Sequence, residues 1–209
     1  MHANPDVSLV RHCGMKSPRE IEIKLKVASP RTLKQRLKQC GFVVFSRRHF
    51  ESNIVFDFGG LRLRRSRSLL RLRSEGNRHL LTFKGPPHAS DSYKIRTEIE
   101  TPIEDAAALQ QIFESLGMQP VFRYEKYRTA YAEKARRKGQ GGPLLVFDET
   151  PIGRYIELEG PARWIDRTAR QLGYGKRDYI TASYAVLYQD YCRENGTRPG
   201  DMVFPGDNS

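Results

Sequence analysis

Charged and apolar side chains alternate along most segments of this chain that have the composition of β-strands. Successive side chains of a strand point to opposite faces. In the segment 20–26, Glu20, Glu22 and Lys24 therefore share one face, and isoleucine and leucine side chains share the other. The same pattern predicts further strands over 60–63, 69–73, 80–84, 93–101, 121–131, 144–148 and 155–159.

Two arrangements can accommodate such strands. In an open antiparallel sheet the charged face of each strand lies in water, which is the ordinary explanation for a single strand. Here, however, glutamate pairs and arginine pairs are concentrated on one face of most of the strands. About eight strands also tend to curl and close. We therefore predict an α+β fold, in which a closed eight-stranded antiparallel β-barrel forms a tunnel with a charged interior and helices pack outside.

Four segments have helical spacing of apolar residues, namely 30–40, 105–116, 161–172 and about 178–194. A weak repeat links strands and helices, because a Glu-apolar-Glu strand leads three times to a helix that ends before glycine. These units start at Glu20, Glu98 and Glu157. Hairpin turns are predicted at 75–77 and 139–143.

A chain of 209 residues suits one domain. We expect tails at 1–18 and 195–209 around a domain at 19–194, and translation could start at Met1 or Met15. No apolar run approaches the about 18 residues of a membrane span, and the first residues do not resemble a signal peptide. The cytoplasm and no membrane partner are therefore expected. Cys13, Cys40 and Cys192 are too few and too scattered to favour disulfide or zinc chemistry.

The formal net charge of +12 indicates an anionic partner. Nucleic acid, acidic lipid and a polyphosphate ligand all satisfy this condition. Six arginines between Arg62 and Arg73, with no acidic residue among them, make a nucleic-acid surface worth considering. Aromatic residues for base stacking do not accompany this run, so nucleic acid is disfavoured.

A closed interior with both signs of charge suits metal-dependent phosphate chemistry. Carboxylates two residues apart on a strand lie about 6.5 to 7 Å apart, and facing pairs can supply oxygen ligands to Mg²⁺ or Mn²⁺. Basic side chains would bind the phosphate oxygens, with arginine as a bidentate partner. These are Arg71, Arg73, Lys84, Lys126 and Arg128. The expected ligand is a triphosphate, and a metal-activated water would attack it. The glycines at 139–142 lack the residues of a P-loop.

An ordered series of motifs then resembles a known family. Glu20-Ile-Glu-Ile-Lys24 resembles the ExExK signature of the CYTH superfamily, the triphosphate tunnel metalloenzymes. The further motifs follow in the order of that family over about residues 19–190: Leu70-Arg-Leu-Arg73, Leu81-Thr-Phe-Lys-Gly-Pro86, Arg96-Thr-Glu-Ile-Glu100, Lys126-Tyr-Arg128, Asp148-Glu-Thr-Pro-Ile-Gly153, Glu157-Leu-Glu-Gly160 and Ser183-Tyr184.

The resemblance implies an eight-stranded tunnel that acts on triphosphates with Mg²⁺ or Mn²⁺. Class IV adenylyl cyclases, thiamine-triphosphatases and inorganic tripolyphosphatases belong to this superfamily. By similarity, the first metal would be held by Glu20, Glu22, Glu157 and Glu159, with Asp148 for a second. The triphosphate would be bound by Lys24, Arg71, Arg73, Lys84 and Arg128. Further residues that line the tunnel would be Glu98 and Glu100, which would bind metal, and Arg96 and Lys126, which would bind substrate.

One departure concerns the last helix. Many relatives have a lysine just before the Ser-Tyr pair, where this chain has Ala182. Lys176 or Arg177 could take its place.

The leading hypothesis is a phosphohydrolase that cleaves the terminal phosphoanhydride, with Lys24 or Lys84 near the reacting phosphate. The alternative is a class IV adenylyl cyclase that converts ATP to cyclic AMP and pyrophosphate, and a third hypothesis is a nucleic-acid or polyphosphate binding module without turnover. The expected partner is a small-molecule triphosphate. The identity of that triphosphate, the choice between the metals and the formation of a homodimer stay open.

Overall fold

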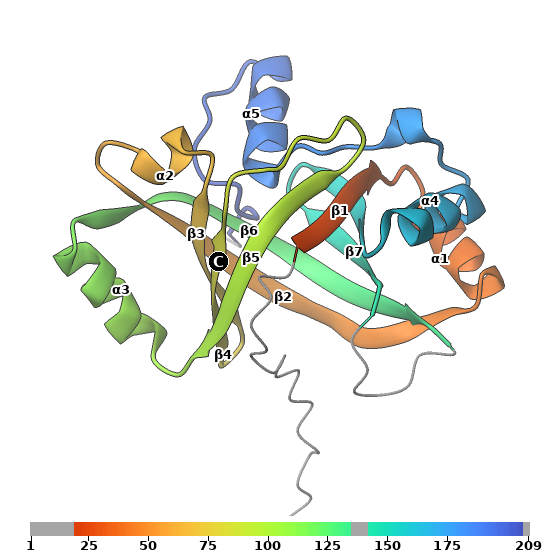
Figure 1. Ribbon diagram of the computed structural model, residues 1–209, viewed down its shortest axis with the longest axis horizontal. Coiled ribbons are helices and arrows are strands. Elements are labelled where there is room, and N and C mark those ends of the chain that lie inside the picture. The colour runs from red at the N-terminus through yellow and green to blue at the C-terminus, as the bar shows by residue number, and fades with distance from the viewer. Residues whose placement is uncertain (1–18, 135–141, 207–209) are drawn as a thin grey trace, which may run out of the picture.

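Eight antiparallel strands close into one barrel in the computed structural model, which describes residues 19–134 and 142–206 (Figure 1). The strands neighbour one another in the order β1-β5-β4-β3-β2-β6-β7-β8, and β8 pairs with β1 to complete the closure. Their bounds are β1 Arg19–Lys26, β2 Phe42–Phe58, β3 Leu69–Glu75, β4 Arg78–Lys84, β5 Lys94–Ile103, β6 Met118–Glu133, β7 Leu144–Thr150 and β8 Gly153–Glu159. The predicted α+β barrel is confirmed.

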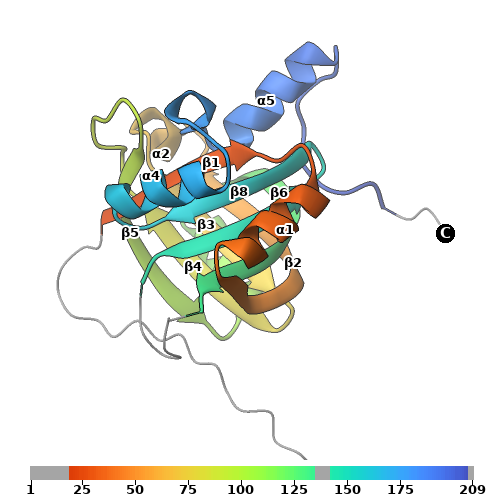
Figure 2. The same cartoon turned by 90° about the vertical axis from the view of Figure 1, so that its right-hand side faces the viewer.

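The described residues form five α-helices outside this barrel, with α1 and α4 over one side and α5 above one end (Figure 2). They are α1 Pro30–Gln39, α2 Arg62–Arg65, α3 Ala106–Ser115, α4 Ala162–Gln171 and α5 Tyr184–Glu194, with a short 3₁₀-helix η1 at Lys176–Asp178. Among the helices of the described residues, none has the length and apolar composition that a membrane crossing requires.

The apolar faces of several strands pack outward under the helices, whereas Ile99 on the outer face of β5 is 59% exposed. Ile23 and Leu25 of β1 are fully buried and pack in one cluster with Leu37 of α1 and Ile165 of α4. A second cluster lies between the barrel and α3, and a third lies beside α5. The hydrophobic core therefore lies mainly between the barrel and its helices, and the charged faces are left to point inward.

The predicted strand-to-helix repeat is present in three dimensions. β1 leads to α1, β5 to α3 and β8 to α4. Each helix is followed by a glycine in the left-handed region, with φ of 78° at Gly41, 79° at Gly117 and 85° at Gly173. Glycine adopts this conformation without the steric penalty of a β-carbon, which is why it ends helices in this way.

Near residue 60 the structure differs from one prediction and contains one element that was not predicted. The predicted strand over 60–63 is wrong, because Arg62–Arg65 form the single helical turn α2. The buried carboxylate of Asp57 fixes this turn by accepting hydrogen bonds from the backbone of Phe58, Leu63 and Arg64 at 2.7 to 2.9 Å. The sequence analysis also missed β2, since three register irregularities against β6 interrupt its alternation.

The C-terminal part also departs from expectation. The last helix begins at Tyr184 rather than near 178, because residue 180 first pairs with β1 through Ile180 and Lys24. Residues after 195 were expected to form a loose tail. Met202 instead exchanges backbone hydrogen bonds of 2.9 Å with Arg123 and Glu125 of β6 and is buried. The expectations for 1–18 and for the turn at 139–141 lie outside the described residues.

Candidate active site

The interior of the barrel collects charged side chains from all eight strands, with Glu98 from β5 and Glu157 from β8 among them. Their main chains are far apart in sequence, and the antiparallel pairings bring them to one space. Those with less than a tenth of their surface exposed are Glu22, Lys24, Glu51, Arg71, Lys84, Lys126 and Asp148. Except for Glu51, every member of this group was predicted from the sequence.

One acidic group is formed by β1 and β5. The Lys84 ammonium group lies 2.7 Å from Glu20 and 3.0 Å from Glu98. Lys94 makes an ion pair with Glu22, across the β1–β5 pairing. Lysine side chains therefore lie among the carboxylates that the sequence assigns to a metal.

The ionisation of these carboxyl groups differs sharply. Burial raises the pKa of Glu20 to about 8, and the adjacent Glu98 carboxyl adds to the rise. Burial alone would also raise the pKa of Glu22, but Lys24 and Lys94 hold it well below its usual range. Burial and the two neighbouring carboxyl groups disfavour the charged form of Glu20. A divalent cation bound here would stabilise that charged form.

A second group surrounds Asp148 on β7. Arg128 binds this carboxylate in a bidentate manner, with both hydrogen bonds at 2.7 Å. Lys126 and Tyr184 donate to the same side chain at 2.9 and 2.8 Å. Oδ2 of Asp148 thus accepts three hydrogen bonds and Oδ1 accepts one, so a metal ion at Oδ2 would have to replace one of these bonds.

Lys24 connects the two groups. Its ammonium group lies 3.2 Å from Glu22 and 3.1 Å from Glu157, and Arg128 makes an ion pair with Glu157. Burial would lower the pKa of Lys24, but the charges of Glu157 and Glu22 raise it. Lys24 is therefore a permanent cation at the centre of the interior.

Arg71 is held in place by neutral partners. It donates hydrogen bonds to the Thr82 hydroxyl at 3.0 Å and to the Tyr124 hydroxyl at 3.3 Å. Glu100 is 3.9 Å away, and its own side chain is two-fifths exposed. Because the ion pair with Glu100 is long and Glu100 is partly exposed, Arg71 keeps the capacity to bind an anion.

Glu51 on β2 is the main site residue that the sequence analysis missed. Its side chain is buried, and Lys126, Arg73 and Arg128 approach its oxygens at 3.4 to 3.6 Å. Neither oxygen accepts a hydrogen bond from the described residues. Glu51 was missed because β2 was not predicted as a strand. Without a predicted strand, the side chain of Glu51 could not be assigned to the inward face.

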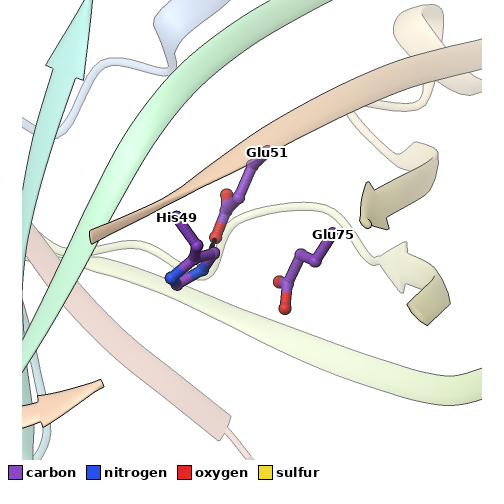
Figure 3. A group of neighbouring side chains, drawn as sticks. All are labelled: His49, Glu51 and Glu75. Atoms are coloured by element: carbon purple, nitrogen blue, oxygen red, sulfur yellow. Dashed lines mark ion pairs between the residues drawn. The ribbon is translucent and has the colours of Figure 1, made fainter. Parts of the chain in front are cut away.

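Glu51 also belongs to a group that offers metal-ligand atoms. His49, Glu51 and Glu75 each provide one such atom, and these atoms lie within 4.8 Å of one another (Figure 3). The His49 ring faces the Glu51 carboxylate at 3.5 Å. Three basic side chains already surround Glu51, so the electrostatic potential here is less favourable to a cation than beside Glu20 and Glu98.

The residues around β1, β5 and β8 fit Mg²⁺ or Mn²⁺ better. They supply several carboxylate oxygens, which are the ligands that these hard cations prefer. Glu22 faces Glu159 in the β1–β8 pairing, and Lys24 faces Glu157. The acidic pairs that the sequence identifies on β1 and β8 are therefore neighbours in the barrel.

Some predicted residues lie at the edge of this arrangement. Arg96 is only half-buried, and its Nε has no hydrogen-bond partner among the described residues. Lys176 lies 3.7 Å from Asp166 on α4 and is largely exposed, so it does not take the place left by Ala182. Arg177 is also exposed. Lys94 lies beside Glu22 in the interior, although the sequence analysis did not name it as a site residue.

Comparison with known proteins gives a family match. Residues 18–184 match the model of the CYTH domain. A protein of Methanocaldococcus jannaschii, provisionally named an adenylate cyclase, is 33% identical over 140 residues, which are 67% of this chain and 75% of that protein.

Solved structures show the same fold. A provisionally named adenylate cyclase from Vibrio parahaemolyticus has a TM-score of 0.71 and 20% identity, and the match covers 83% of this chain and 99% of that one. A Hippeastrum protein, provisionally assigned as an adenylyl cyclase and described as having a dominant triphosphatase activity, has a TM-score of 0.58 and 18% identity. That match covers 86% of this chain and 97% of the other.

Proposed function

The chain belongs to the CYTH domain family, whose members act on triphosphates with a divalent metal, and from this we propose that it is a metal-dependent triphosphatase of the cytoplasm. The reaction would be hydrolysis of the terminal phosphoanhydride. The observation that carries this proposal is the closed interior, in which acidic pairs lie beside buried basic side chains from other strands. Such an interior can hold a metal and a chain of phosphates together.

The basic side chains would bind the phosphate oxygens. Arg71 is oriented by hydroxyl groups and is ready to form a bidentate pair with phosphate. Lys24 and Lys84 are buried and positively charged, and burial strengthens their attraction for an anion. Either lysine would neutralise charge on the reacting phosphate. The remaining proposed contacts are Arg73, Arg96, Lys126 and Arg128.

The acidic side chains would hold the metal. We assign Glu20, Glu22, Glu157 and Glu159 to a first ion, Asp148 to a second, and Glu98 and Glu100 to the surrounding acidic shell. Bound Mg²⁺ or Mn²⁺ would supply a Lewis acid for phosphoryl oxygen and an activated water. Lys84 and Lys94, which now contact Glu20 and Glu22, would become available to phosphate.

The test is neutralisation of one carboxylate on each of two strands. Glu22→Gln and Glu159→Gln keep the side-chain shape, and each should reduce metal-dependent turnover by more than the about 10- to 100-fold that loss of an outer-shell partner costs. Phosphate release at varied Mn²⁺ concentration is the measurement. Glu104→Gln, at an exposed loop position, is the matched control and should behave as wild type.

A different result would contradict the proposed metal assignment. If both interior variants hydrolyse triphosphates normally and differ only in the midpoint of denaturation, the glutamates are structural, and the proposed metal assignment is wrong.

A class IV adenylyl cyclase is the second candidate. The provisional name of the relative that is 33% identical favours it. The same interior would bind the triphosphate of ATP, but the ribose 3′-hydroxyl would attack the α-phosphate, and pyrophosphate would leave. Chromatography of ATP products separates the two reactions, since only the cyclase forms cyclic AMP.

A further inference from the structure

The chain returns to the barrel wall after α5. Residues 201–204, which we call the C-terminal strap, lie along β6, and Met202 forms a parallel bridge with Tyr124. The backbone of Met202 exchanges two hydrogen bonds of 2.9 Å with the residues on either side of Tyr124. β7 pairs with residues 127–131 of the same strand, and β2 occupies the opposite edge at Tyr124. The strap therefore extends the barrel wall along the edge of β6 that β7 uses.

Side chains at both ends of the strap fix its position. The Asp201 carboxylate accepts a hydrogen bond of 2.8 Å from the backbone N–H of Arg123. The Glu125 carboxylate accepts one of 3.0 Å from the backbone N–H of Phe204, and the centroid of the Phe204 ring lies 5.3 Å from that of Tyr127. Each of these bonds satisfies a backbone donor. The strap is therefore a fixed part of the barrel wall.

The side chain of Met202 belongs to a cluster that contains three tyrosines. Its exposed fraction is 1%, and it packs in this cluster with Tyr124, Ile152, Tyr155 and Tyr184. The centroid of the Tyr184 ring lies 6.2 Å from that of Tyr124 and 5.7 Å from that of Tyr155. An unbranched thioether side chain fills irregular gaps between rings. Truncation of Met202 would therefore leave a cavity beside these rings.

Tyr124 connects the cluster to the charged interior. Its hydroxyl accepts a hydrogen bond of 3.3 Å from Arg71, and the Thr82 hydroxyl accepts one of 3.0 Å from the same guanidinium group. Tyr184 is held by its own hydroxyl, which donates to Asp148 at 2.8 Å. The direction of Arg71 therefore depends on Tyr124, and the place of the Tyr124 ring depends on the packing of the cluster.

We propose that Met202 is a positioning residue for the triphosphate site and acts on Arg71 through Tyr124. This inference rests on the proposed function, in which Arg71 binds phosphate oxygens. The strap follows the residues that match the CYTH domain, so the family match assigns no role to it.

The test compares two buried methionines. Met202→Ala should raise KM for tripolyphosphate at least about tenfold and lower kcat less, because a loosened Arg71 binds phosphate less well. Met118→Ala is the matched control, since Met118 is also buried but packs with Phe56 of β2 and Phe113 of α3. Each variant leaves a cavity and should lower the melting temperature by about 4 to 20 °C. At a temperature where both are folded, Met118→Ala should keep the wild-type KM.

Two further variants separate positioning from packing. Met202→Leu nearly keeps the side-chain volume and should restore KM to within about threefold of wild type. Tyr124→Phe removes the hydroxyl that Arg71 uses and should itself raise KM. In this background, Met202→Ala should raise KM by less than about threefold, because two substitutions on one route are not additive. If either alanine variant fails to fold, valine at both methionine positions repeats the comparison.

A binding measurement distinguishes this inference from the proposed function. Tripolyphosphate with Mn²⁺ should raise the melting temperature of Met118→Ala as it does that of wild type, and that of Met202→Ala by less. The inference is overturned if the two alanine variants have equal KM and equal shifts, or if Met202→Ala has its full effect in Tyr124→Phe. If wild type binds triphosphate without hydrolysing it, the proposed function fails, and the shifts alone decide the inference. If wild type binds no triphosphate, both are wrong.

Discussion

Glu51 places a negative charge where water does not reach it. Burial would raise the pKa of its carboxyl group, but Arg128, Arg73 and Lys126 hold that pKa well below its usual range. The three cations come from β3 and β6 and would repel one another without this carboxylate. We interpret Glu51 as the anion that keeps them together until a triphosphate arrives.

Glu51→Gln should therefore destabilise the protein mainly in the absence of ligand. Removing one charge of a buried cluster typically lowers the free energy of unfolding by about 3 to 5 kcal/mol. Saturating tripolyphosphate supplies negative charge to the same cations, so it should raise the melting temperature of the variant more than that of wild type. Thermal unfolding with and without tripolyphosphate measures both effects.

Glu149→Gln is the control for this substitution. Glu149 makes an ion pair with Arg48 at 2.8 Å, and the Arg48 side chain is half exposed. Its loss should cost about 1 kcal/mol or less, with no dependence on ligand. If Glu51→Gln loses the same stability with and without tripolyphosphate, Glu51 is a structural residue with no link to the anion site.

At the scale of elements, the three strand-to-helix units end in different surroundings. Gly117 and Gly173 both have φ near +80°, but a β-carbon at Gly117 would meet open space. At Gly173 it would overlap the Arg36 guanidinium, which donates a hydrogen bond to the Leu172 carbonyl. α1 and α4 are therefore joined at this turn.

Alanine at these two positions should separate backbone strain from that contact. Gly117→Ala should lower the free energy of unfolding by about 1 to 2 kcal/mol, which is the cost of a left-handed non-glycine residue. Gly173→Ala should lose about 1 kcal/mol more, the net value of one hydrogen bond. Urea denaturation of both variants gives the comparison, and equal losses would show that Arg36 moves aside without cost.

Strands and helices could be predicted where the spacing of apolar residues within one segment indicates them. The seven strands other than β2 have two-residue alternation, which predicts their position and their inward face. β2 pairs with β6 through three register irregularities, so its alternation is interrupted. α2 depends on Asp57, whose carboxylate fixes the turn through hydrogen bonds with residues up to seven positions away. No local pattern encodes such contacts.

At the scale of the whole molecule, closure of the barrel turns separate strand faces into one site. The residue types of the site were predictable, because each charged face can be identified on its own strand. Their pairing was not, because it depends on register between strands. Lys94 beside Glu22 and Tyr184 beside Asp148 are examples, since neither contact follows from the spacing within one segment.

The structure of the whole molecule shows how the charged residues behind the net charge of +12 are distributed. Among the described residues, the buried charged side chains balance one another, with four basic residues against four acidic ones, so the excess lies outside this buried set, in part on the exposed arginines of α2. A surface of this kind also suits the hypothesis of a nucleic-acid or polyphosphate binding module. Affinity for an oligonucleotide would fall steeply with salt in that case and would not depend on Glu22 or Glu159.

The measurement that tests the central claim most directly is an assay of products from tripolyphosphate, thiamine triphosphate and ATP, each with Mg²⁺, Mn²⁺ or a chelator. We expect metal-dependent release of orthophosphate from at least one of them, and its loss in Glu22→Gln. Cyclic AMP and pyrophosphate from ATP would instead identify the cyclase. No turnover of any triphosphate with either metal, together with salt-sensitive oligonucleotide binding that Glu22→Gln retains, would contradict the account.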